Sequence, residues 1–341
     1  MVKKASLWLL VVLLVVTMGA GGCAGKEGAQ KEKVINVRFS EVVRSIFYAP
    51  QYVAINQGFF EDEGLKVELT TDQGADKVMT ALLSGAADIG LAGAEATVYV
   101  YNQGQEDYVL NFAQLTRRDG SFLVGRQPEP DFKWENLKGK TIIGGRPGGI
   151  PEMVLEYVLK EHGLTPGKDV KIITNLQFTA TAGAFTGGTG DYVALFEPTA
   201  SMLEQEGAGQ VVASIGLSSG ELPYTVYMAR KSFIRENPEV VQKFTNAIYR
   251  GQLWVASHQP HEVAEAIASF FPGTDMELLT RVVERYMEQD TWCVTPYMQY
   301  APFVYMQNII KTAGELDKTI EPSVLITHDF ARRAIESKRG K

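Results

Sequence analysis

Cysteine is scarce in this 341-residue chain, which contains only Cys23 and Cys293. Two cysteines cannot form a disulfide framework or a thiolate zinc site. The four histidines show no recognised metal-ligand spacing, and the Gly-rich segment 144–149 lacks the Gly-Lys-Ser/Thr ending of a phosphate-binding loop. The sequence therefore predicts no catalytic residue, no metal and no cofactor, and it favours a binding protein over an enzyme.

The chain also lacks an excess of positive charge, with 33 basic against 40 acidic side chains and a net charge of −7. Proteins that bind nucleic acid need surplus Lys and Arg on one face, so nucleic acid is excluded as the main partner. Hydrophobic residues make up 45% and charged residues 21% of the chain, which is typical of globular proteins. The length suits one large domain or two lobes of about 100–200 residues each.

A long apolar run is missing as well: the run at residues 7–16 is much shorter than the roughly 20 residues of a membrane helix. Lys3 and Lys4 precede this run and small residues follow it, as in a secretory signal. The small residues before Cys23 resemble a bacterial lipobox, although Ala20 stands where Leu is usual. An ordinary secretory signal with an incidental cysteine is the alternative.

We therefore expect residues 1–23 to be a lipoprotein signal peptide and residues 24–33 a polar tether. The lipid would be attached to Cys23. The protein is then expected to be extracytoplasmic, anchored to the outer face of the cell membrane or periplasmic.

The mature chain contains an internal repeat, because residues 67–104 and 170–207 align over 38 positions without a gap. Each copy reads as a strand, a polar loop, a helix, a Gly–Asp turn, an apolar strand and a further helix. Such βαβ units imply parallel strands with helices on the faces of a sheet. Each copy is also preceded by another strand and helix. We therefore expect two similar α/β lobes with mixed, mainly parallel sheets.

The segment after the second copy reads as helical. Asn237-Pro238-Glu239 is typical of a helix start, and no third repeat follows it. Further helices are predicted at 260–270, 276–288 and 302–313. We expect this helical segment to pack back on the first lobe.

With this arrangement the chain crosses between the lobes twice, near residues 122–126 and 222–227. The predicted first lobe spans 34–122 and 227–330, and the second spans 123–226. Two crossovers make a hinge over a cleft, and small ligands bind in clefts between domains.

Three motifs resemble a known protein family. They are Asn56–Leu65 (NQGFFEDEGL), the turn Gly85–Gly90 (GAADIG) and Trp134–Ile142 (WENLKGKTI), and Leu195–Pro198 (LFEP) fits the same pattern. They resemble the solute-binding proteins of ABC importers for alkanesulfonates, taurine, nitrate and the pyrimidine precursor of thiamine. The resemblance covers about residues 35–313.

The resemblance implies a type II periplasmic-binding-protein fold and a small-molecule ligand in the cleft. It also implies delivery of that ligand to an ABC permease with a cytoplasmic ATPase, and we expect the protein to act as a monomer. A fungal pyrimidine synthase related to this family uses a cysteine cluster with a histidine. This sequence contains no such cluster.

Ligands of open α/β sheets bind beyond the carboxyl ends of the strands, where helix N-termini offer free N–H groups. The residues that we expect there are Arg44, Phe47, Tyr48, Gln73, Gly74, Ala94, Glu95, Thr116, Arg146, Gly148, Gly149, Phe178, Glu197 and Tyr224. The repeat brings Glu95 and Glu197 within one position of register, so both lobes are expected to face the cleft with an acid.

Each of these residues has a structural alternative. The arginines would be solvated loop charges, the aromatic residues lobe core, and the acids first-turn residues of helices. Thr116, Asp119 and Ser121 would belong to the crossover without touching a ligand.

Paired carboxylates beside aromatic rings favour a flat heterocycle that carries N–H donors, whereas they would repel an oxyanion. We therefore expect a heteroaromatic, thiamine-pyrimidine-like solute. An alkanesulfonate, taurine or nitrate is the alternative, and a ligand sensor for a membrane receptor would have the same sequence features.

Overall fold

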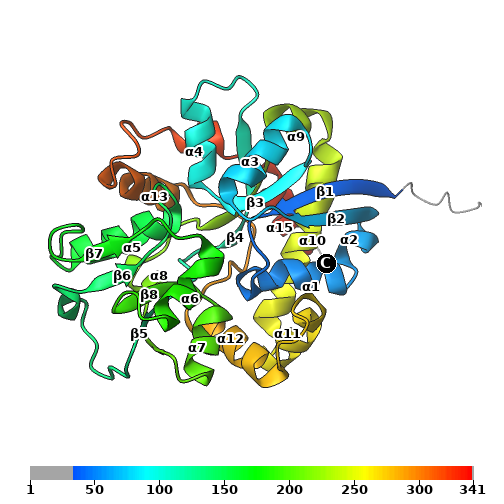
Figure 1. Ribbon diagram of the computed structural model, residues 1–341. Coiled ribbons are helices and arrows are strands. Elements are labelled where there is room, and N and C mark those ends of the chain that lie inside the picture. The colour runs from blue at the N-terminus through cyan, green and yellow to red at the C-terminus, as the bar shows by residue number, and fades with distance from the viewer. Residues whose placement is uncertain (1–33, 340–341) are drawn as a thin grey trace, which may run out of the picture. The chain divides into compact units, whose positions relative to one another are not determined.

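The computed structural model describes residues 34–339. Cys23, the predicted signal peptide and the predicted tether lie outside these residues. The described part of the chain is built around two β-sheets of five strands each (Figure 1). Within it, no helix combines the length and the apolar character that crossing a membrane requires.

The first sheet has the strand order β2-β1-β3-β10-β4. Parallel pairing joins β1 to β2 and β3, whereas β10 runs antiparallel to β3 and β4. The strands are β1 (Ile35–Glu41), β2 (Leu65–Thr71), β3 (Ile89–Gly93), β4 (Val109–Thr116) and β10 (Thr225–Arg230). Their connecting helices are η1 (Ile46–Tyr48), α1 (Ala49–Asn56), α2 (Phe59–Asp62), α3 (Ala75–Ser84) and α4 (Glu95–Asn102). This sheet and the helices packed on it are called the first lobe below.

The second sheet repeats this order as β7-β6-β8-β5-β9, with β5 as the antiparallel strand. Its strands are β5 (Ser121–Gly125), β6 (Thr141–Ile143), β7 (Lys171–Ile173), β8 (Tyr192–Phe196) and β9 (Gln210–Ser214). The helices are η2 (Trp134–Leu137), α5 (Ile150–Glu161), η3 (Phe178–Ala180), α6 (Thr181–Thr186), α7 (Thr199–Gln205) and α8 (Ile215–Ser219). They form the second lobe, and the predicted fold class is confirmed.

The sequence repeat corresponds to a structural repeat. In the first copy, β2, α3, β3 and α4 follow one another, and β7, α6, β8 and α7 take the same places in the second copy. The Gly85 turn after α3 has a left-handed backbone with φ 74°, a conformation that glycine adopts without strain. In each repeat the second strand, β3 or β8, leads at its carboxyl end into the last helix, α4 or α7, and the predicted acids Glu95 and Glu197 lie at this transition.

The chain passes between the sheets through residues 117–120 and 220–224, called the first and second connection below. The segment 122–126, predicted as a crossover, lies mostly in β5 instead, because Phe122, Leu123 and Val124 are buried strand residues. The two connections are joined by hydrogen bonds from the backbone of Leu222 to Arg117 (3.0 Å) and of Tyr224 to Thr116 (3.2 Å). The predicted limits of the lobes as domains stay a prediction.

The C-terminal segment is helical, as predicted. Its helices are α9 (Lys231–Glu236), α10 (Pro238–Ser257), α11 (Pro260–Ile267), η4 (Ala268–Phe270), α12 (Met276–Glu288), α13 (Tyr300–Thr312), α14 (Pro322–Leu325) and α15 (Asp329–Arg339). Helix α10 packs on α1, α2 and α15 of the first lobe. Helix α12 lies between α11 and α7 and contacts both, and α13 contacts α4 and α5 (Figure 1). The segment thus covers the first lobe and also touches the second with α12 and α13.

Helix α12 shows why this segment folds as it does. Asp275 caps its first turn by accepting a hydrogen bond from the Leu278 N–H (2.8 Å). Leu278, Val282 and Tyr286 then recur at helical spacing, and all three are buried. This buried stripe fixes which face of the helix turns toward the lobes, and it places Arg285 toward α7 of the second lobe.

Candidate functional site

Aromatic side chains from both lobes meet between the sheets. Phe47, in η1 after β1, has ring-centroid distances of 5.7 Å to Tyr48, 5.7 Å to Phe196 and 5.6 Å to Tyr224. Phe196 ends β8 of the second lobe and also packs against Phe178 at 5.9 Å. These five rings are called the aromatic cluster below. The structure therefore brings together the predicted residues Phe47, Tyr48, Phe178 and Tyr224.

Glu95 contributes a buried acid beside this cluster. It begins α4 directly after β3, and its side chain is only 4% exposed. Burial raises the pKa of Glu95 to about 7, although the backbone N–H groups of Glu95 and Ile150 favour the charged form. Its Oε2 has no hydrogen-bond partner among residues 34–339. Gly93 makes room for this carboxylate, because a Cβ there would overlap it.

A second buried acid, Asp119, lies in the first connection. Its Oδ1 accepts hydrogen bonds from the N–H and hydroxyl of Ser121, at 2.6 Å for the N–H. Burial raises the pKa of Asp119 to about 6. Within the described chain, Asp119 Oδ2 and the Tyr224 hydroxyl each lack a hydrogen bond of normal geometry. The two groups are nevertheless close, because the Tyr224 hydroxyl lowers the pKa of Asp119, and burial together with the Asp119 carboxylate raises the pKa of Tyr224. Asp119 was considered at the sequence level but not chosen as a site residue, because it could belong to the crossover without touching a ligand.

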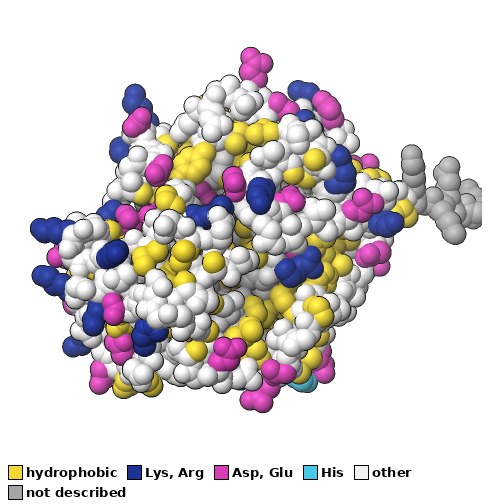
Figure 2. Space-filling view, in the orientation of Figure 1, with side chains coloured by type: hydrophobic (Ala, Val, Ile, Leu, Met, Phe, Trp, Pro, Cys, Tyr) yellow, Lys and Arg dark blue, Asp and Glu magenta, His cyan; other side chains and the backbone are white. Residues whose placement is uncertain are grey.

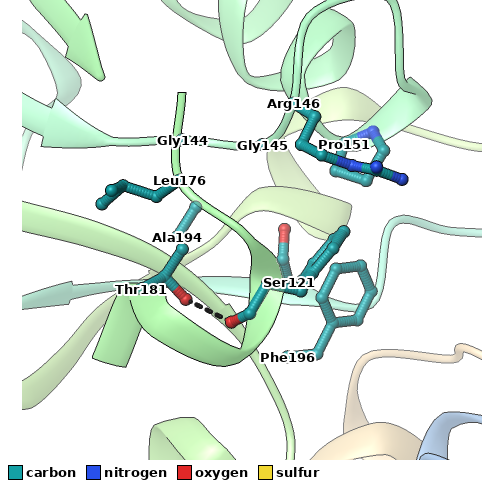
Figure 3. A pocket seen from close by; sticks show the side chains of 10 residues that line it. Ser121, Gly144, Gly145, Arg146, Pro151, Leu176, Thr181, Ala194 and Phe196 are labelled. Carbon is teal, nitrogen blue, oxygen red and sulfur yellow. Dashed lines mark hydrogen bonds between the residues drawn. The ribbon is translucent and has the colours of Figure 1, made fainter. Parts of the chain in front are cut away.

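A narrow hollow opens beside the aromatic cluster on the second lobe (Figure 3). Its cavity volume of about 10 Å³ is room for roughly one water molecule. A solute of ring size therefore needs the lobes or side chains to move apart before it can enter. The lining residues are Ser121, Gly144, Gly145, Arg146, Pro151, Leu176, Phe178, Thr181, Ala194 and Phe196. Figure 2 shows hydrophobic side chains along the junction of the lobes on this face, with Lys and Arg side chains beside them.

The loop before α5 holds the second lobe against the first. Arg146 lies 3.4 Å from Asp76 of α3, and the Tyr99 hydroxyl of α4 donates a hydrogen bond to the Gly148 carbonyl (3.0 Å). The Ile150 N–H at the start of α5 faces the Glu95 carboxylate. Three groups of the first lobe thus contact one loop of the second, so this loop closes the cleft on that side.

The glycines of this region have local reasons to be glycine. Gly148 has φ 72°, in the left-handed region, and Gly149 is the residue before α5. At Gly74, a Cβ would lie only 3.1 Å from Nη2 of Arg146. The predicted residues Gly74, Arg146, Gly148 and Gly149 therefore meet at the closed edge of the cleft.

Arg44 is held away from the aromatic cluster. Its Nε lies 2.8 Å from Oε1 of Glu41, and Nη2 donates a hydrogen bond to Thr71 (3.2 Å). The guanidinium also lies over the rings of Tyr52 and Phe270. These contacts hold the loop that leads to Phe47. Arg44 therefore supports the site by positioning this loop.

Glu197 does not face Glu95 as the repeat predicted. Its carboxylate accepts hydrogen bonds from the N–H and hydroxyl of Ser201 (both 2.9 Å) and from Arg285 (2.6 Å). The repeat aligns Glu197 with Ala94, one residue before Glu95. Glu95 is therefore the first residue of α4, whereas Glu197 lies in the loop between β8 and α7, and the two acids do not occupy equivalent positions.

The remaining predicted residues have other surroundings. The Thr116 hydroxyl is 2.6 Å from that of Thr225, which ties β4 to β10. Ala94 is fully buried, and Gln73 is exposed with a φ of 61°. Cys293 is buried, which raises the pKa of its thiol. In the described part of the chain, no group of three acidic, His or Cys side chains could hold a metal ion.

Replacing Gly120 by Ala is expected to lower the free energy of unfolding by about 1–3 kcal/mol. A Cβ at this position would overlap the ring of Phe47, so the ring that centres the aromatic cluster would have to shift. Urea unfolding of the variant measures the loss. Gly183→Ala is the control, because nothing lies within 4 Å of a Cβ there. Equal stability of the two variants would contradict the assigned packing of Phe47.

A sequence model of the NMT1/THI5-like family matches residues 46–262, which is more than half of the chain. The chain belongs to this family. The family resemblance expected from the sequence motifs is confirmed at this level.

Two similar proteins have names that indicate different functions, one a binding protein and the other an enzyme. A protein of Bacillus subtilis (strain 168), YtlA, named as a candidate binding protein, is 45% identical over 309 residues, covering 91% of this chain and 92% of that protein. The 4-amino-5-hydroxymethyl-2-methylpyrimidine phosphate synthase of Candida albicans (strain WO-1) is 25% identical over 251 residues, covering 70% of this chain and 72% of that enzyme. This NMT1/THI5-like chain is therefore much more similar to the bacterial protein.

A solved structure shows the same fold. The alkanesulfonate-binding protein SsuA from Xanthomonas axonopodis pv. citri, bound to MOPS, superposes with a TM-score of 0.69 at 16% identity, covering 87% of this chain and 99% of that chain. At this identity the likeness shows the fold alone. The expected periplasmic-binding-protein fold is confirmed for this NMT1/THI5-like chain.

Proposed function

We propose that the chain is an extracytoplasmic solute-binding lipoprotein of an ABC importer. It captures a small heteroaromatic, thiamine-pyrimidine-like solute between the lobes and delivers it, as a monomer, to a permease with a cytoplasmic ATPase. The observation that carries the ligand class is the buried Glu95 carboxylate beside the aromatic cluster, with Oε2 free to accept a hydrogen bond.

The chemistry of the site favours this ligand class over an anion. Glu95 and Asp119 are both buried, and neither is in an ion pair among residues 34–339. A sulfonate or nitrate placed near them would be repelled by each carboxylate in its charged form. An aromatic ring with N–H donors can instead stack on the cluster and donate to the free carboxylate oxygens.

An anion remains the second candidate because of one observation. Arg146 lines the hollow beside the start of α5, and arginine with a helix N-terminus is a common anion site. The nearby Asp76 already neutralises Arg146, and the Ile150 N–H faces Glu95. These two contacts make the anion the weaker candidate.

A thermal-shift screen tests the proposed ligand class. The probes are 4-amino-5-hydroxymethyl-2-methylpyrimidine, the pyrimidine in the name of the Candida albicans relative, together with flavins, taurine, nitrate and MOPS, the ligand of the SsuA structure. We expect the pyrimidine to raise the melting temperature, because a ligand that binds only the folded state stabilises it. A shift with nitrate or MOPS alone would reverse the assignment.

Replacing Cys23 by Ser is expected to move the protein from the membrane fraction to the soluble fraction. The thiol of Cys23 is the proposed lipid attachment point, and serine cannot be acylated in its place. Fractionation of cells followed by immunoblotting measures the distribution. Cys293→Ser is the control, because this cysteine is buried among the residues that the structure describes. A Cys23→Ser protein that stays with the membrane would contradict the lipid anchor.

A further inference from the structure

Asp119 is positioned where the two lobes join. It lies in the first connection, and Tyr224, whose hydroxyl faces it, lies in the second. The two connections are joined by the hydrogen bond from the Leu222 N–H to the Arg117 carbonyl (3.0 Å), and beside them the Thr116 and Thr225 hydroxyls, 2.6 Å apart, tie β4 to β10. Any group that binds at Asp119 therefore contacts the segment through which the lobes are joined.

Only one of the two Asp119 carboxylate oxygens accepts hydrogen bonds of normal geometry from the described part of the chain. Oδ1 accepts both hydrogen bonds from Ser121, whereas Oδ2, although the residue is fully buried, has no hydrogen bond of normal geometry and is faced by the Tyr224 hydroxyl. Residues 34–339 contain eight buried polar side-chain atoms without a partner, and three of them are Glu95 Oε2, Asp119 Oδ2 and the Tyr224 hydroxyl. The Tyr224 hydroxyl faces Asp119 and occupies at most one acceptor position of its carboxylate. A carboxylate oxygen accepts more than one hydrogen bond, so Asp119 Oδ2 can still accept from a ligand, and pairing it removes the cost of a buried unpaired oxygen.

In the described chain, the nearby arginines form no ion pair with the Asp119 carboxylate. Arg117 forms an ion pair with Asp290, and Arg118 lies 3.8 Å from the same acid. The backbone of residues 119–120 is held by α12 and the residue after it, since Gln289 Nε2 donates to the Asp119 carbonyl (2.8 Å) and the Tyr286 hydroxyl to the Gly120 carbonyl (3.0 Å). Asp119 is thus held in place with acceptor capacity left on Oδ2, which is how a binding residue is preorganised.

We propose that Asp119 is a ligand-contacting residue of this site, whose Oδ2 accepts a hydrogen bond from an N–H donor of the solute. The inference rests on the proposed function and adds a second acid to Glu95. The two acids then come from the first lobe and from the connection between the lobes, in place of the pair Glu95 and Glu197. Ser121, which lines the hollow and donates to Oδ1, holds the Asp119 carboxylate in orientation.

A pair of probes tests this assignment by calorimetric titration. The first is 4-amino-5-hydroxymethyl-2-methylpyrimidine, and the second is the same ring without its amino group. Asp119→Asn is expected to weaken binding of the first probe by roughly 10-fold or more and binding of the second by much less. Asp119→Ser also removes the carboxylate and serves if the Asn variant does not fold. Asp290→Asn, which removes an exposed acid near the same connection, should bind both probes as the wild type does.

The outcomes separate this inference from the proposed function. Unchanged binding of the amino probe by Asp119→Asn would overturn the role of Asp119 alone. An equal loss for both probes would also overturn it, because a structural defect does not distinguish the probes. A wild-type protein that binds neither probe would overturn the proposed ligand class, and this inference with it.

Discussion

Glu95→Gln is expected to weaken binding of the aminopyrimidine probe by roughly 10- to 150-fold. Glutamine keeps the size of the side chain and one acceptor oxygen, so the change isolates the charge of Glu95 from its shape. A hydrogen bond to an ionised acceptor contributes about 1.5–3 kcal/mol, which sets this range. Calorimetric titration measures the affinity. Glu61→Gln, on the exposed surface of α2, is the matched control and should bind as the wild type does.

The same variant is expected to be more stable than the wild type in the ligand-free form at pH 8. The pKa of Glu95 is about 7 in the folded protein, above its ordinary value of 4.5. The folded protein therefore binds more protons than the unfolded chain between these pH values, so wild-type stability falls as pH rises from about 4.5 through 7. Glutamine does not ionise and removes a penalty of up to about 3 kcal/mol.

Opposite signs in these two measurements distinguish a ligand-binding acid from a structural one. A structural carboxylate would lose stability when neutralised, whereas Glu95 is expected to lose affinity and gain stability. Urea unfolding at pH 5 and pH 8 measures the second effect. Unchanged or tighter binding of the aminopyrimidine by Glu95→Gln would contradict the proposed ligand class and favour the anion.

Arg285→Met is expected to lower the free energy of unfolding by about 3–5 kcal/mol. Arg285 lies 2.6 Å from Oε1 of Glu197 and 2.7 Å from Oε2 of Glu204, and the Glu197 side chain is fully buried. Removing the cation leaves Glu197 as an uncompensated buried charge. The contact joins α12 of the C-terminal segment to α7 of the second lobe, so its loss also weakens one side of the junction between the lobes.

Two further variants test whether this loss of stability comes from the buried ion pair. Arg281→Met removes an exposed pair with Glu277 on the same helix and should cost at most about 1 kcal/mol. Arg285→Lys should fall between the two, because lysine cannot bind both acids with a planar fork. Denaturant unfolding compares all three. A cost below about 1 kcal/mol for Arg285→Met would contradict the buried ion pair.

The fold could be predicted from the sequence because its signals are local and repeated. The gapless alignment of residues 67–104 with 170–207 predicted two βαβ units, and the Gly–Asp turns marked where each helix gives way to a strand. The first crossover was placed a few residues too late, because Phe122–Val124 form a short buried strand beside a connection. Apolar residues at such a place fit a strand and a hinge equally well.

The site was predictable only in part, because its chemistry depends on contacts between distant segments. The aromatic residues were found from their loops, which the repeat located. Glu95 and Glu197 differ by one residue in the register of the repeat. Glu197 is also bound by Arg285, which lies 88 residues further along the chain and could not be linked to it from the sequence. Asp119 has no local signal. Its importance follows from burial and an unpaired oxygen, which only the folded chain reveals.

A crystal structure of the protein with bound 4-amino-5-hydroxymethyl-2-methylpyrimidine tests the central claim most directly. We expect the ring to lie against Phe47, Phe196 or Tyr224, with the two N–H donors of its amino group within hydrogen-bond distance of the Glu95 and Asp119 carboxylates. The free oxygens of both acids should then be paired. A ring bound elsewhere, or a site whose only occupant is an anion held by Arg146 and the start of α5, would contradict the account.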